Sequence, residues 1–117
     1  MSQYQEIQKV NNVTIIKDSN GRLGLKDSSN SIVLGTKYNS IVLLSNIDGN
    51  RFYKLEIDGL IGIYDTVGVK LVIDCKLTKI ERVDTLRRIV KAKVPIWECS
   101  FLKKFPLLWM DTEIPLP

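Results

Sequence analysis

Positively charged side chains gather in one stretch of this sequence, residues 75–104, beside large aromatic side chains. Nine basic and three acidic residues give the stretch a formal charge of +6, although the whole chain carries only +4. Such charges can meet phosphate groups, and aromatic rings beside them can stack on nucleic-acid bases. Arginine and tryptophan are also favoured at the centres of protein interfaces. The residues that we expect to bind a partner are Arg87, Arg88, Lys91, Lys93, Trp97, Lys103 and Lys104.

Three interpretations of this basic segment stay open. It could meet an acidic protein partner, or it could bind nucleic acid as a non-specific module. It could also be a solvated lysine-rich face or edge strand whose charge blocks aggregation. We take a protein partner as the leading hypothesis and nucleic acid as the alternative.

Catalytic machinery is not evident in the sequence. The chain has no histidine, which is the commonest general base and a frequent metal ligand, and it has no phosphate-binding glycine loop. Most of its aspartates lie in turn sequences, where their side chains typically bond the local backbone. Cys75 and Cys99 are too few for a disulfide framework or a zinc site, so we expect free thiols. We therefore expect a protein that is not an enzyme and that needs no metal or cofactor.

An internal repeat with a period of about 38 residues organises the chain. Residues 13–27 and 52–65 both consist of an apolar strand, an Asn-Gly or Asp-Gly turn, and then Gly-x-apolar-Gly-apolar-x-Asp. The turn glycines supply the positive φ of a tight hairpin, and the glycine inside each second strand marks a bulge or a close backbone approach. The similarity continues into a third strand, so the repeat units are 13–41 and 52–80.

This pattern resembles the bacterial WG repeat, also called the KWG type, over residues 13–80. Gly21 to Asp27 and Gly59 to Asp65 follow its first half, Gly-x-Trp-Gly-Leu-Ile-Asp, and Lys37 to Ile41 follows its Lys-Tyr-x-x-Ile half. The signature tryptophan is replaced by Leu23 and Ile61. The resemblance implies a non-enzymatic repeat module with a binding function.

Residues 81–117 are expected to form a degenerate third unit or a cap, because repeat units need neighbours to bury their faces. Val90, Ala92 and Val94 alternate with polar residues, which favours a half-buried strand, and Pro95 would place that strand at an edge. The last residues, 101–117, are predicted to form a short helical turn and an extended tail. A competing interpretation is a helical stripe formed by Ile80, Val83, Leu86 and Val90.

The sequence as a whole predicts one all-β, mostly antiparallel domain over residues 1–117, built from repeated hairpin units with a C-terminal capping segment. No apolar run approaches the ~20 residues of a membrane span, and no secretion signal is visible, so we expect a cytoplasmic protein with no membrane contact. With a short chain and no catalytic groups, the leading hypothesis is a protein-binding module. It could be an inhibitor or immunity protein that blocks its partner. Self-association through an edge strand is a third possibility.

Overall fold

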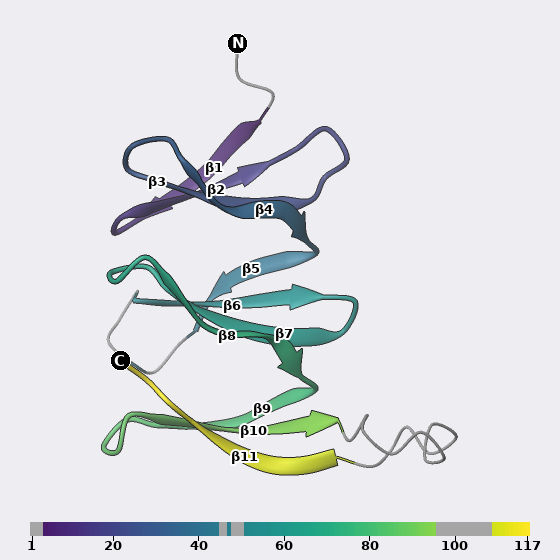
Figure 1. Ribbon diagram of the computed structural model, residues 1–117, viewed down its shortest axis with the longest axis vertical. Helices are drawn as coiled ribbons and strands as arrows, with labels where there is room; N and C mark the ends of the chain where they lie inside the picture. The colour runs from purple at the N-terminus through teal and green to yellow at the C-terminus, as the bar shows by residue number, and fades with distance from the viewer. Residues whose placement is uncertain (1–3, 45–46, 48–50, 96–108) are drawn as a thin grey trace.

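Antiparallel strands form three sheets that stack along the longest axis of the molecule (Figure 1). The computed structural model describes residues 4–44, 47, 51–95 and 109–117. The described residues confirm the all-β antiparallel class. The first sheet contains β1 (Gln5–Val10), β2 (Val13–Lys17), β3 (Leu23–Asp27) and β4 (Ile32–Tyr38). The second contains β5 (Ser40–Leu43), β6 (Phe52–Ile57), β7 (Leu60–Asp65) and β8 (Lys70–Leu77). The third contains β9 (Lys79–Asp84), β10 (Ile89–Pro95) and β11 (Trp109–Pro115).

The two hairpins of the sequence repeat are present as β2–β3 and β6–β7. In the second hairpin, Asp58 and Gly59 both have positive φ, 51° and 85°, as a two-residue turn requires. The prediction of an equally tight turn at Asn20-Gly21 is wrong. Only Gly21 has positive φ there, and the loop holds five residues, because Lys17 pairs with Leu23.

The longer turns are closed by aspartate side chains, as the sequence predicted. The Asp18 carboxylate accepts hydrogen bonds from the backbone N–H of Asn20 and Arg22, at 2.9 and 3.0 Å. Asp27 repeats this arrangement in the β3–β4 turn, where it accepts from Ser29 and Ser31 at 2.9 and 3.0 Å. These carboxylates therefore act as turn closures.

The glycine inside each second strand makes room for the neighbouring strand, as predicted. A Cβ on Gly24 would lie 2.5 Å from the carbonyl oxygen of Leu34, and one on Gly62 would lie 2.7 Å from that of Ile73. The pairings of β3 with β4 and of β7 with β8 are both bulged at these places. The bulge pushes a backbone carbonyl onto the strand before it, and only glycine accommodates that approach.

A single residue separates the last strand of one sheet from the first strand of the next. Asn39 lies between β4 and β5, and Thr78 lies between β8 and β9 (Figure 1). The backbone N–H of Asn39 donates to the carbonyl of Glu56, and that of Thr78 donates to the carbonyl of Lys93, both at 2.8 Å. One sequence repeat thus supplies strands to two sheets, which the repeat alone did not indicate.

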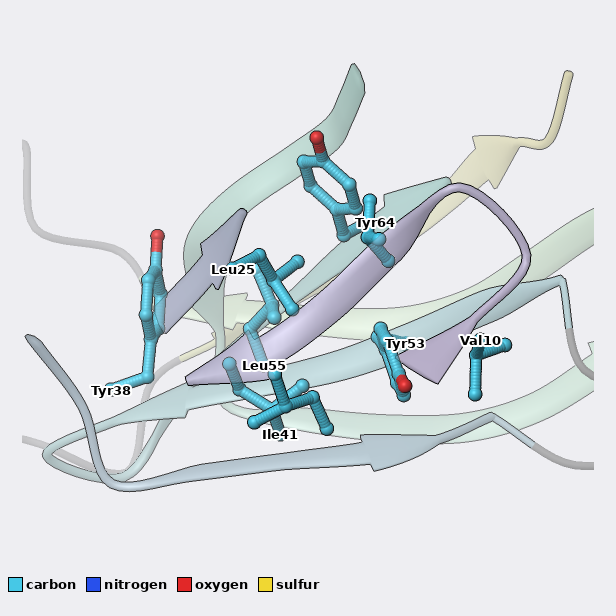
Figure 2. Packing of buried hydrophobic residues seen from close by; sticks show 9 residues of the cluster. Val10, Leu25, Tyr38, Ile41, Tyr53, Leu55 and Tyr64 are labelled. Atoms are coloured by element: carbon cyan, nitrogen blue, oxygen red, sulfur yellow. The ribbon is translucent and has the colours of Figure 1, made fainter. Parts of the chain in front are cut away.

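Two apolar layers fill the spaces between the sheets, so the second sheet is buried on both faces. Along β6, Tyr53 and Leu55 join the layer against the first sheet, whereas Phe52 joins the layer against the third. Figure 2 shows the first layer, with Tyr38 at one end and Val10 at the other. The hydroxyl of Tyr53 has no hydrogen-bond partner among the described residues, and burial raises its pKa to about 12.

A polar cluster joins the first sheet to the second at the side of these layers. Arg51 donates two hydrogen bonds of 3.0 Å to the Asp65 carboxylate, whose side chain is only 1% exposed. Thr66 donates its hydroxyl to the carbonyl of Arg51 and accepts a 2.8 Å bond from the Asn11 side chain. The β1–β2 turn also bonds Thr66 and Val67 through Asn12, at 3.3 and 3.0 Å. Buried charge is tolerated here because it is paired and hydrogen-bonded.

The strand interpretation of residues 81–95 is confirmed, because this part of the chain forms β9 and β10 of the third sheet. The competing helical stripe is wrong. The prediction that Pro95 marks an edge strand is wrong, because β10 lies between β9 and β11. Pro95 is the last residue of β10 and lies two residues beyond the last pair of β10 with β9. Its missing N–H therefore costs no hydrogen bond between these two strands. The prediction of a tail is also wrong for residues 109–115, which form β11. The predicted helical turn near residue 101 lies outside the described residues.

Cys75 is a free, half-buried thiol, and Cys99 lies outside the described residues. Burial raises the pKa of the Cys75 thiol. No helix in the described part of the chain is long and apolar enough to cross a membrane.

The close approach at Gly62 leads to a stability prediction. Changing Gly62→Ala should lower the free energy of unfolding by about 1–3 kcal/mol, because the added Cβ meets the backbone of β8 and the bulge must shift. The matched control is Gly35→Ala in β4, where no atom lies within 4 Å of an added Cβ, and a change within about 0.5 kcal/mol is expected. Urea unfolding measures both. Equal effects at the two positions would contradict the close approach.

The buried ion pair leads to a prediction about acid. Burial alone would raise the pKa of Asp65, but hydrogen bonds from Arg51 and from the backbone of Gly68 and Val67 outweigh it and hold the pKa below 3.8. The stabilisation is therefore present above pH 3.8 and is lost as the pH falls through the lowered pKa. Asp65→Asn should cost about 2–4 kcal/mol at pH 7, because Arg51 loses its carboxylate.

Asp18→Asn is the control for this measurement, because an asparagine oxygen can close the same turn. A much smaller cost than that of Asp65→Asn is expected for that exposed turn. If Asp65→Asn were as mild as the control at pH 7, the ion pair would not stabilise the second sheet.

Candidate functional site on the outer face of the third sheet

The third sheet turns one face to the second core layer and leaves the other face uncovered by any described strand. Along β10, Val90 and Ala92 are buried in the core layer, and Lys91 and Lys93 therefore point to the opposite, outer face. The strand thus places two of the predicted binding lysines side by side on the outer face.

Acidic residues on the two flanking strands hold these lysines. Lys93 lies 2.8 Å from Glu81 of β9 and 2.7 Å from Asp111 of β11. Lys91 lies 3.8 Å from Glu113, its register partner in β11. The register thus places an acid of β11 directly across from each lysine, whereas on β9 their register partners are Arg82 and Lys79.

The two predicted arginines lie at the β9–β10 turn and are also engaged. Arg87 donates to the Asp84 carboxylate at 2.9 Å, and its side chain remains 60% exposed. Arg88 has a positive φ of 54° and donates to the carbonyl oxygen of Pro117. Its own carbonyl accepts a 2.8 Å bond from the backbone N–H of Leu116. Arg88 thus fixes the end of β11 as well as carrying charge.

A hollow of about 700 Å³ lies in this region of the sheet. Its charged lining consists of two basic and three acidic residues, so its formal net charge is −1. The hollow is lined by Glu81, Arg82, Lys91, Ala92, Asp111, Thr112 and Glu113. The site is therefore a patterned face of mixed sign, which differs from the uniformly basic patch that the sequence suggested.

Sequence reasoning identified the lysines of this face but missed the acids of β11. Asp111 and Glu113 alternate with Met110, Thr112 and Ile114, and that period of two could have identified the strand. The predicted site residues Trp97, Lys103 and Lys104 lie outside the described residues, so the structure does not bring them to the face.

Comparisons with known proteins do not identify the chain. No family model matches it, and no curated protein or solved structure shows significant similarity to it. Among the described residues there is also no group of three or more histidine, cysteine or acidic side chains that could hold a metal ion.

The ion pairs of the face lead to a titration prediction. Hydrogen bonds to Asp111 and then to Glu81 raise the pKa of Lys93 above its ordinary value of 10.5. The stabilisation from these pairs is present below pH 10.5 and is lost as the pH rises through the raised pKa. Asp111→Asn should lower the pKa of Lys93 toward 10.5 in an NMR titration of its Nζ. The control, Glu6→Gln in the first sheet, should leave the pKa of Lys93 unchanged. A pKa of Lys93 that stayed the same in Asp111→Asn would contradict the pairing.

Proposed function

We propose that this protein acts by binding a partner protein through the outer face of the third sheet, without catalysing a reaction. The observation that carries the proposal is the ordered pattern of opposite charges on that face. Lys93 is held between Glu81 of β9 and Asp111 of β11 at 2.8 and 2.7 Å, and Lys91 lies 3.8 Å from Glu113 of β11. Side chains already held in place lose little conformational entropy on binding, and a charge pattern selects a complementary surface.

A protein partner is favoured over nucleic acid because the described cations of the face are offset by acids. Binding to a phosphate backbone depends on lysines and arginines that replace its counterions. In the hollow of this face, three acidic side chains would approach the same phosphates as two basic ones, and their repulsion would cancel the attraction. A protein surface can present both signs in a matching order.

The mode of action that we propose is occupation of a partner's surface, as an inhibitor or immunity protein does. A stack of sheets tied by corner strands and by the side-chain hydrogen bonds of Asn11 and Asn12 presents its outer face as a firm surface, and blocking a partner needs no further machinery. The resemblance to the WG repeat supports a binding role in the same sense. Two of the glycines that carry the resemblance, Gly24 and Gly62, also let the strands of each sheet pack closely.

The test reverses the lysines of the face and compares the proteins retained. Lys91→Glu combined with Lys93→Glu should reduce retention of partner proteins from the native cell at least tenfold. The two new glutamates join Glu81, Asp111 and Glu113, and these five acids repel a surface that complements the original charge pattern. The control variant, Lys9→Glu combined with Lys17→Glu, makes the same change of charge on exposed residues of the first sheet. It should still retain the partner proteins. Cross-linking with quantitative mass spectrometry reads both.

Circular dichroism should confirm that both double variants fold. Partners that remain on the Lys91→Glu, Lys93→Glu variant would contradict the proposal. A random oligonucleotide that binds the wild type tightly at low salt and is lost with the same variant would favour nucleic acid instead.

A further inference from the structure

The third sheet lacks the strand that completes the other two. In the described chain, β3 pairs with both β2 and β4, and β7 pairs with both β6 and β8, whereas β11 pairs only with β10. The far edge of β11 is therefore open among the described strands. An open, regular edge is a template for a strand from another chain.

The register shows which backbone groups face that edge. The N–H of Leu116 donates to Arg88, so the even-numbered residues of β11 direct their backbone groups to β10. The odd-numbered residues, among them Asp111 and Glu113, then direct theirs outward. Pro115 fits this rule, because it stands where a missing N–H costs no bond to β10. The pairing of β10 with β11 has no bulge, so the outward groups are evenly presented.

A second copy of this chain cannot complete the third sheet with a strand bulged as β4 and β8 are. Thr112 pairs with Ala92 at the position where Gly24 pairs with Ile16 and Gly62 pairs with Leu55. Those glycines accept the bulged approach of β4 and β8, at which a Cβ would lie 2.5–2.7 Å from a carbonyl oxygen. Thr112 carries such a Cβ. A bulged strand like β4 or β8 from a second copy therefore clashes, whereas a regular strand does not.

The side chains beside the edge indicate the chemistry of the occupant. On the outer face, Asp111 and Glu113 have side chains that are 82% and 55% exposed, so basic residues directly across from them are favoured. On the other face, a hollow of about 340 Å³ lies between the start of β8 and the end of β11. Its apolar lining includes Leu71, Val72 and Leu116, and it suits an apolar side chain.

We propose that the open edge of β11 accepts, as a fourth strand, a regular extended segment of the partner protein in which basic and apolar residues alternate. The proposal rests on the proposed function and adds the contact through which the partner is held. Backbone hydrogen bonds to the outward groups of β11 hold the segment. The alternation of its side chains selects it, with basic residues over Asp111 and Glu113 and apolar residues toward β8.

The probe is a fluorescein-labelled octapeptide of alternating lysine and valine, followed by fluorescence anisotropy with the full chain. The wild type should bind it, and should bind the peptide with glutamate in place of lysine at least tenfold more weakly. Two further peptides carry N-methyl groups on one or the other alternate set of amides. One should lose binding at least tenfold and the other should keep it, because only one edge of the peptide pairs with β11.

Two variants of the chain separate backbone from charge. Glu113→Pro removes an outward N–H without breaking a bond to β10, and should weaken binding at least tenfold while thermal unfolding stays cooperative. Glu113→Gln keeps that N–H and should weaken binding less. Asp111→Lys combined with Glu113→Lys should reverse the preference toward the glutamate peptide.

The proposal is overturned if no alternating peptide binds the wild type. It is also overturned if the Glu113→Pro variant binds the lysine–valine peptide as tightly as the wild type does, and the wild type binds both methylated peptides as tightly as the unmethylated one. The two proposals fail differently. Cellular partners lost with Lys91→Glu, Lys93→Glu but kept with Glu113→Pro would leave the outer face as the binding surface and refute the edge. Partners kept with both would refute the proposed function itself.

Discussion

The strand that leaves one sheet and enters the next is the constraint on which this stack depends. A sheet in a repeat stack contacts only its neighbours and depends on them to bury its apolar faces. At each corner a buried residue, Tyr38 or Leu77, precedes the single linking residue, so the chain cannot leave one sheet without filling a core layer. The backbone bonds of Asn39 and Thr78 then set where the next sheet begins. Folding of one sheet therefore positions the next.

The ends of the stack differ from its middle by substitution at equivalent positions. In the second sheet, the pair Tyr53–Tyr64 lies in the first core layer, where it packs against the first sheet. The equivalent pair in the first sheet is Thr14–Lys26, on the face with no described neighbour, and Lys26 is paired there with Glu6. The third sheet ends the stack with the lysines and acids of its outer face. Polar outer faces of this kind are what terminal repeats need in water.

Much of the fold could be predicted because local rules determine it. Alternation, turn aspartates and the interior glycines each correspond to one backbone requirement. They agree with the structure at β10, at the turns closed by Asp18 and Asp27, and at the close approaches of Gly24 and Gly62. The crossing between sheets could not be predicted, because the sequence repeat does not say which sheet each strand joins. The five-residue loop at Asn20-Gly21 was missed for a related reason. The Asp18 carboxylate accepts hydrogen bonds from two backbone N–H groups. These bonds stabilise the five-residue loop in place of a two-residue turn.

The lysines of the candidate site were predicted and the acids of β11 were not. These acids turn the expected basic patch into a face of mixed charge. A window along the sequence counts the lysines of β10 but not the acids that pairing brings beside them from β11, about twenty residues later. Mixed charge changes what the face can do. The electric field of the face falls off quickly with distance because opposite charges cancel. The face would therefore steer partners weakly, and the association rate would depend little on salt. At contact, each misplaced charge in a wrong partner meets a like charge. In the complex that we propose, discrimination would therefore come from the order of charges across the sheet rather than from their sum.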